Sequence, residues 1–106
     1  MDFTLNFLHQ FVIALYLTSP LLAFLSTFII CLGMVVGHIE KWNKSDTLYW
    51  TFITATTVGY GDFRPSKPSS RTLAVFIAII GIMLTGIIVA ITIHTATLAF
   101  KQQLLP

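Results

Sequence analysis

Two glycines alternate with larger residues in the segment from Thr57 to Gly61, which reads Thr-Val-Gly-Tyr-Gly. Glycine adopts positive φ at little steric cost, so Gly59 and Gly61 allow the backbone to alternate in handedness from residue to residue. Successive carbonyl groups would then point the same way and could replace the water that a cation loses in a narrow passage. Neutral carbonyls bind an ion strongly enough for entry and weakly enough for release. The alternative is an ordinary glycine-rich turn.

The side chains of this segment are of types that could hold it in place. Thr57 adds a hydroxyl at its inner end, while Val58 and Tyr60 are expected to point away from the ion path into protein packing. The Tyr60 ring could brace the segment against the aromatic side chains that precede it, which are Tyr49, Trp50 and Phe52. One copy of the segment cannot surround an ion, so a closed ring of identical chains follows.

The composition indicates a membrane protein. Of the 106 residues, 56% are hydrophobic and only 9% are charged, whereas a soluble domain of this size needs far more charge on its surface. A net charge of +2 gives no support for binding nucleic acid. The sequence contains no nucleophile–base pair and no cluster of metal ligands. Apart from the segment 57–61 it contains no glycine-rich loop that could bind phosphate, so nothing suggests an enzyme or a bound cofactor. The single cysteine, Cys31, is expected to be a small buried hydrophobic residue.

Two long apolar segments flank the motif, which predicts an all-α membrane fold in one domain, residues 1–106. Residues 3–18 predict a helix in the membrane interface or the cytosol, and the Ser-Pro pair that follows would start the next helix. That outer helix, 20–39, is close to the ~30 Å hydrocarbon core in length. The inner helix, 71–100, is longer than the core and must tilt, bend or project into the cytosol.

A short helix over 46–56 is expected to lead directly into the motif. Ser45 suits its N-cap, and Asp46 is an acid in its first turn. The helix is too short to cross a bilayer, so the chain would enter the membrane with it and leave through segment 57–61. Such non-helical backbone is tolerated at membrane depth only where it lines a water-filled or ion-filled path. The negative C-terminal end of the helix would stabilise a cation there.

With these residues in view, the chain resembles the two-transmembrane-helix prokaryotic potassium channels over residues 20 to 100. The resemblance rests on LYWTFITATTVGYGD at 48–62, on Pro65 and on Gly81. It implies a homotetramer, three identical subunits joining each chain in the lipid bilayer of the cell membrane, with both termini cytosolic. It also implies that K⁺ is the permeant ion, bound by the carbonyls of the selectivity filter, residues Thr57, Val58, Gly59, Tyr60 and Gly61.

The resemblance implies roles outside the filter as well. Asp62 is expected to accept a hydrogen bond from Tyr49, with Trp50 also supporting the filter. Gly81 matches the hinge glycine of the inner helix, although a close helix–helix contact is the alternative. Gly86, Ala90 and His94 are then expected near the gate, where His94 could respond to internal pH or could be a neutral interfacial histidine.

Some features depart from the family pattern. Ile53 stands where some members have a glutamate paired with the aspartate, so filter bracing is expected to differ. Arg64 stands at the outer mouth, where some members have an aromatic residue, and four arginines there should repel cations. A poorly selective Na⁺/K⁺ channel is the alternative function.

The distribution of basic residues opposes the implied topology. The positive-inside rule expects them in the cytosol, but five would be external, namely Lys41, Lys44, Arg64, Lys67 and Arg71. We give the filter more weight, because its orientation is tied to the re-entrant geometry. One explanation is that the chain is the pore of a ligand-gated channel, excised from a cytosolic part that carries the basic residues.

Overall fold

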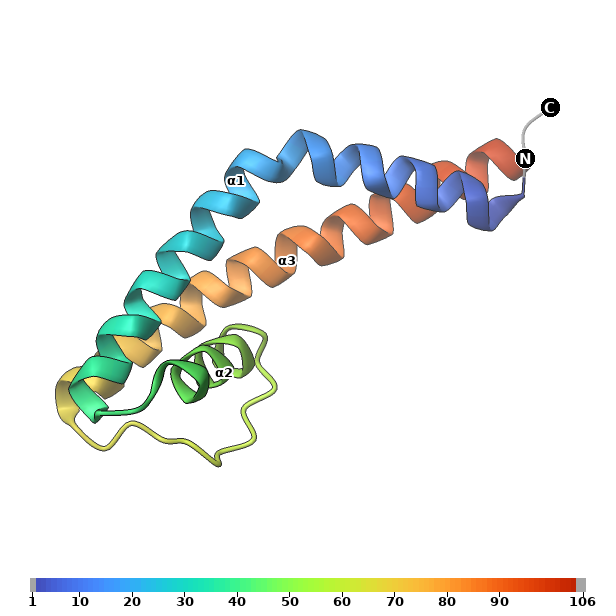
Figure 1. Ribbon diagram of the computed structural model, residues 1–106. Coiled ribbons are helices and arrows are strands. Elements are labelled where there is room, and N and C mark those ends of the chain that lie inside the picture. Colours follow the sequence, from blue (N-terminus) through green and yellow to red (C-terminus); the bar gives the residue numbers. More distant parts are fainter. Residues whose placement is uncertain (1, 105–106) are drawn as a thin grey trace.

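The computed structural model describes residues 2–104, which form three helices and their connections. Helix α1 is Phe3–Glu40, α2 is Lys44–Ala55 and α3 is Pro68–Leu104. Helices α1 and α3 run side by side in opposite directions, with the first turns of α1 beside the last turns of α3 (Figure 1). Both are long and apolar enough to cross a membrane, which confirms the predicted all-α fold class with two spans.

Helix α1 continues through Ser19 and Pro20, so the prediction that one helix (3–18) ends and another (20–39) begins there is wrong. Proline has no N–H to donate to the carbonyl one turn earlier, that of Tyr16. The Ser19 hydroxyl donates to this carbonyl at 2.8 Å and so satisfies it. The helix bends in this part of the chain (Figure 1), as helices do where a proline interrupts their hydrogen bonds.

The first half of α1 packs on the last turns of α3. The rings of Phe3 and Phe100 meet edge to face with their centroids 6.4 Å apart. Thr95 and Ala99, on the same stretch of α3, are buried. Each long helix measures about 55 Å at 1.5 Å per residue, well beyond the ~30 Å of the hydrocarbon core.

Helix α2 packs against α1 through pairs of small residues. Gly33 of α1 faces Thr51, and Gly37 faces Thr47, so closely that a Cβ on either glycine would overlap the threonine side chain. Small residues four apart on both helices let the two backbones approach, as in the packing of membrane helices. The buried core beside this contact joins all three helices and comprises Ile29, Val36, Trp50, Ala55 and Ile77.

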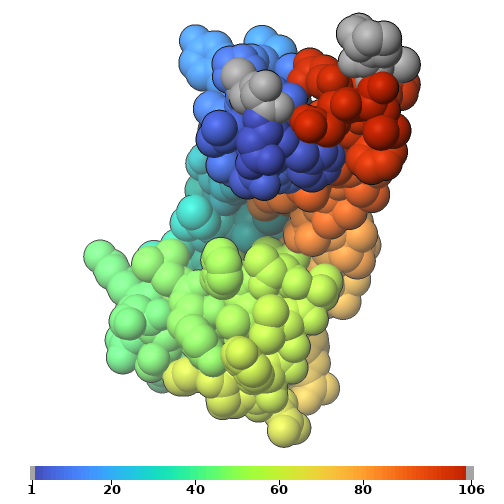
Figure 2. All heavy atoms as spheres, turned by 90° about the vertical axis from the view of Figure 1, so that its right-hand side faces the viewer, coloured from blue at the N-terminus to red at the C-terminus, as the bar shows by residue number. Residues whose placement is uncertain are grey.

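The ends of α2 lie within two residues of the predicted 46–56, but the cap differs. Asn43, not Ser45, is the N-cap, and its Oδ1 accepts from the backbone N–H of Asp46 at 2.8 Å. Asp46 is in the first turn, as predicted, where its charge favours the positive end of the helix. Figure 2 shows α2 and the following loop (green to yellow) as a broad mass at the end of the molecule away from the first turns of α1.

Helix α3 begins at Pro68 rather than 71 and runs to Leu104 rather than 100. Proline suits a first helical position, because its missing N–H has no partner there in any helix. The loop before it is held by Glu40, at the end of α1. The Glu40 carboxylate accepts from Ser66 N–H at 2.9 Å, from the Ser66 hydroxyl at 2.8 Å and from Lys67 N–H at 3.2 Å.

The bonds to Glu40 predict a loss of stability in acid. The backbone N–H of Ser66 is the main cause that lowers the pKa of Glu40, which lies beyond the apolar part of α1, from 4.5 to about 2. Because the folded-state pKa is depressed, this stabilisation is present above about pH 4.5 and is lost as the pH falls towards 2. We expect thermal unfolding of purified Glu40→Gln to vary less than wild type over this range. Equal pH profiles for the two proteins would contradict the prediction.

Candidate functional site

Segment 57–61, directly after α2, alternates in backbone handedness. The φ angle is +66° at Thr57, +57° at Gly59 and +82° at Gly61, whereas Val58 and Tyr60 lie outside the positive region. The pattern expected from the two glycines is therefore present. It also extends to Thr57, where positive φ was not expected, because a β-branched residue rarely adopts it.

The inner part of the segment is tied to α2 by its backbone. The N–H of Gly59 donates to the Ile53 carbonyl at 3.1 Å, and the N–H of Thr57 donates to the Thr54 carbonyl at 3.2 Å. The Thr57 hydroxyl turns back to the Thr56 carbonyl at 2.6 Å. Within residues 2–104, no hydrogen bond reaches four successive carbonyls, those of Thr57, Val58, Gly59 and Tyr60. These oxygens have the free lone pairs that an ion ligand requires.

The outer end of the segment is different, because its last carbonyl has a partner. The Gly61 carbonyl accepts a hydrogen bond from Nε of Arg64 at 2.9 Å. Arg64 is exposed and lies just beyond the segment. The adjacent Asp62 carboxylate accepts from the backbone N–H of Phe63 at 3.2 Å.

The predicted pair of Tyr49 and Asp62 is close in space. Burial is the first cause that raises the pKa of the Tyr49 hydroxyl, and the neighbouring Asp62 carboxylate is the second. The Asp62 carboxylate also accepts from the backbone N–H of Phe63. The arrangement brings the pair together as expected, with a hydrogen bond from Tyr49 to Asp62 among the causes of the raised pKa, and the role of the pair in supporting the filter remains a prediction.

Four aromatic side chains, two of them on α2, form a cluster. Trp42 lies with its ring centroid 5.3 Å from that of Trp50 and 5.7 Å from that of Phe63, and the Tyr49 and Phe63 centroids are 6.2 Å apart. Trp42 and Phe63 were missed as supports of the site. Phe63 lies two residues after Gly61, whereas Trp42 lies before α2, and the aromatic character of both was the only signal available in the sequence.

Tyr60 is not part of the aromatic cluster. Its side chain is 72% exposed and forms no aromatic pair in the described chain, so the predicted bracing against Tyr49, Trp50 and Phe52 has no ring contact within one subunit. Val58 and Phe52 are also exposed, by 50% and 69%. Three apolar side chains at the site therefore lack cover from their own chain.

The four residues predicted for hinge and gate lie on two sides of α3. Gly81 is buried against α2, where a Cβ would overlap the main-chain atoms of Ala55. This contact supports the alternative of close helix packing for Gly81, and the hinge remains a prediction. Gly86, Ala90 and His94 are exposed along one face at intervals of four residues. They lie where gate residues could meet in an assembly, and this role also remains a prediction.

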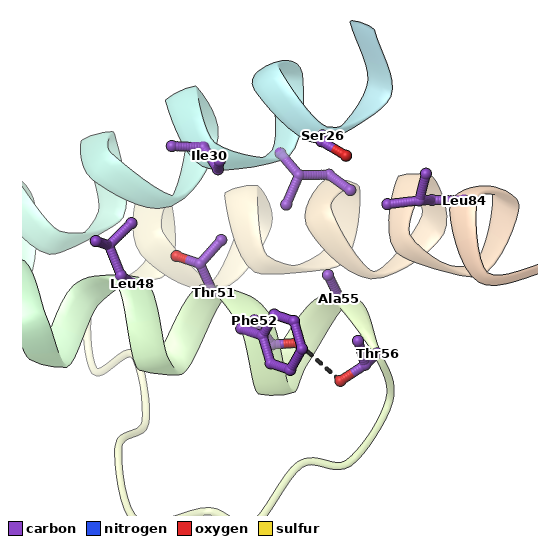
Figure 3. Close-up of a pocket in the computed structure, with 9 residues that line it drawn as sticks. Ser26, Ile30, Leu48, Thr51, Phe52, Ala55, Thr56 and Leu84 are labelled. Atoms are coloured by element: carbon purple, nitrogen blue, oxygen red, sulfur yellow. Dashed lines mark hydrogen bonds between the residues drawn. The ribbon is translucent and has the colours of Figure 1, made fainter. Parts of the chain in front are cut away.

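A pocket of about 360 Å³ is lined by residues of all three helices. Ser26 and Ile30 line it from α1, Leu48 and Phe52 from α2, and Leu84 from α3 (Figure 3). Its lining is almost wholly apolar. Thr56 lies at its edge, with its hydroxyl donating to the Phe52 carbonyl at 2.8 Å. The pocket offers space for hydrocarbon, and the polar side chains in its lining are those of Ser26, Thr51 and Thr56. None of the described residues form a cluster of His, Cys, Asp or Glu suited to a metal.

Three known potassium channels are similar to parts of this chain. "TWiK family of potassium channels protein 7" of Caenorhabditis elegans is 34% identical over 50% of this chain and 10% of the relative. "Two-pore potassium channel 1" of Arabidopsis thaliana is 38% identical over 70% of this chain and 19% of the relative. "Voltage-gated potassium channel" of Aeropyrum pernix is 48% identical over 40% of this chain and 12% of the relative.

The chain thus spans less than a fifth of the length of these three relatives. No solved structure gives a significant match. A family model described as an ion channel matches residues 21–97, from the bend in α1 to the last turns of α3. Because this match covers well over half of the chain and includes the whole site, the chain belongs to this ion channel family.

Proposed function

We propose that four copies of this chain form a channel that conducts K⁺ selectively across the cell membrane. The observation that carries this proposal is the alternating φ of residues 57–61, together with four successive carbonyls that accept no hydrogen bond in the described chain. A K⁺ ion that sheds its water needs rings of such oxygens at several sites in series. The names of the relatives, all potassium channels, support the choice of ion.

Assembly follows from the incompleteness of the site in one chain. A single strand of carbonyls lies on one side of an ion only, so symmetry must supply the other sides. The exposed side chains of Phe52, Val58 and Tyr60 support the same conclusion, since neighbouring subunits would cover them. A fourfold ring gives each ion site the carbonyls of four chains.

The orientation in the membrane is part of the proposal. The first turns of α1 and the last turns of α3 lie together at the end opposite to α2 (Figure 1). We place this end in the cytosol and segment 57–61 at the external side. The C-terminus of α2 is followed directly by the filter, so the negative ends of four such helices would stabilise a cation in the cavity below it.

Reconstitution of the purified chain in a planar bilayer tests the function. With unequal K⁺ and Na⁺ on the two sides, we expect a reversal potential close to the K⁺ equilibrium value. A reversal potential near zero would support the alternative, a poorly selective Na⁺/K⁺ channel. No current at any gradient, from protein that is tetrameric in detergent, would refute conduction by this chain.

A further inference from the structure

Arg64 is the one charged side chain bonded to a filter carbonyl in the described chain. Its Nε donates to the Gly61 carbonyl at 2.9 Å, while the four carbonyls before Gly61 accept no hydrogen bond. A carbonyl that shares its electron density with a guanidinium, and lies beside its positive charge, is a poorer ligand for a second cation. The outermost carbonyl is therefore chemically unlike the four that precede it.

We propose that Arg64 is a positioning residue that weakens the Gly61 carbonyl as a ligand for K⁺. The permeant ions are then held by the carbonyls of Thr57 to Tyr60, and an ion leaves the outer end of the filter without a strong last site. This inference rests on the proposed K⁺ conduction. It assigns to Arg64 a specific bond to the filter, which differs from a general repulsion of cations by charge at the mouth.

Two effects of Arg64 must be separated, its hydrogen bond and its charge. Glutamine is a suitable replacement, because its side-chain nitrogen follows three side-chain carbons, as Nε does in arginine. Arg64→Gln therefore keeps a donor at the same distance along the side chain and removes the charge. The methionine of Arg64→Met is as long as glutamine but has neither a hydrogen-bond donor nor a charge. Comparing these two variants isolates the hydrogen bond.

Arg71 offers a matched control on the same side of the molecule. Its Nε donates to the Pro65 carbonyl at 3.3 Å, outside the filter. Arg71→Met removes the same charge and the same side-chain nitrogens as Arg64→Met but leaves the Gly61 carbonyl with its partner. A change that arises from surface charge alone would appear in both variants.

The measurement is the K⁺ concentration that gives half-maximal single-channel conductance in symmetric solutions. We expect this half-saturating concentration to be lower in Arg64→Gln than in wild type, and lower again in Arg64→Met. The difference between the two variants should be about two- to tenfold, which is the factor that one hydrogen bond contributes. Arg71→Met should match wild type. Arg64→Leu provides a second variant without a donor if Arg64→Met does not assemble.

The proposal is overturned if Arg64→Gln and Arg64→Met have the same half-saturating concentration, since only the charge would then act. It is also overturned if Arg71→Met shifts the value as much as Arg64→Met. Wild-type reversal potentials distinguish these results from failure of the proposed function. A wild-type channel that does not select K⁺ over Na⁺ refutes the function, whereas a selective channel with equal variants refutes only the role of Arg64.

Discussion

Replacing Gly81 with alanine is expected to unfold the pore, whereas the same change at Gly86 is expected to be tolerated. A Cβ at Gly81 would overlap the oxygen, Cα and carbonyl carbon of Ala55. These are main-chain atoms at the end of α2, so relief requires a shift of the helix that leads into the filter. Forcing an extra carbon into a packed contact typically destabilises a protein by about 1–3 kcal/mol, and every subunit of the proposed tetramer would carry the defect.

Gly86 is the matched control for Gly81, because a Cβ there meets nothing within 4 Å. Alanine is a better helix former than glycine by about 1 kcal/mol, so Gly86→Ala should leave the thermal stability unchanged or raise it. Thermal unfolding and the oligomeric state in detergent would be measured for both variants. Adding Ala55→Gly should not rescue Gly81→Ala, because the overlap is with the backbone.

The same pair of variants decides between packing and a hinge at Gly81. If the residue serves only as a hinge, Gly81→Ala should assemble and melt like wild type while its opening probability changes. Normal stability with altered opening would therefore contradict the packing role. Loss of the tetramer in Gly81→Ala, with a normal tetramer in Gly86→Ala, would support it.

Much of the fold was predictable because it depends on composition and local pattern. Two long apolar segments can only become spanning helices in lipid, and the acid at Asp46 marked the start of a short helix between them. Pro20 misled the prediction because its consequence depends on a neighbour. The Ser19 hydroxyl satisfies the carbonyl that the proline leaves free, and the helix continues with a bend.

The site was predictable in its conformation and less so in its contacts. Glycine at alternate positions predicted positive φ at Gly59 and Gly61, since this preference belongs to the residue itself. The bond from Arg64 to Gly61 joins residues only three apart, but it depends on the turn that the chain makes at Asp62 and Phe63, which the residue types alone do not specify. The contact of Gly33 and Gly37 with two threonines has a signal in the sequence, since glycines four apart in an apolar helix favour close helix packing.

The second large effect is expected at Gly59, where alanine should abolish selection of K⁺ over Na⁺. The φ angle at Gly59 is +57°, and a Cβ there meets no atom within 4 Å in the chain. The penalty therefore comes from the backbone, because an L-residue in the left-handed region loses roughly 1–2 kcal/mol. An alanine that leaves this region rotates the adjoining peptide groups and takes their carbonyls out of line.

Val58→Ala is the control for Gly59→Ala, because Val58 has no positive φ and the change shortens a side chain without constraining the backbone. Reversal potentials under unequal K⁺ and Na⁺ would be measured for both variants, with wild type beside them. We expect Val58→Ala to stay near the K⁺ equilibrium value and Gly59→Ala to move towards zero or carry no current. If Gly59→Ala selected K⁺ as wild type does, the carbonyls could not depend on alternating handedness, and the mechanism proposed for the filter would fail. In the proposed ring of four identical chains, even a modest penalty per subunit is multiplied about fourfold.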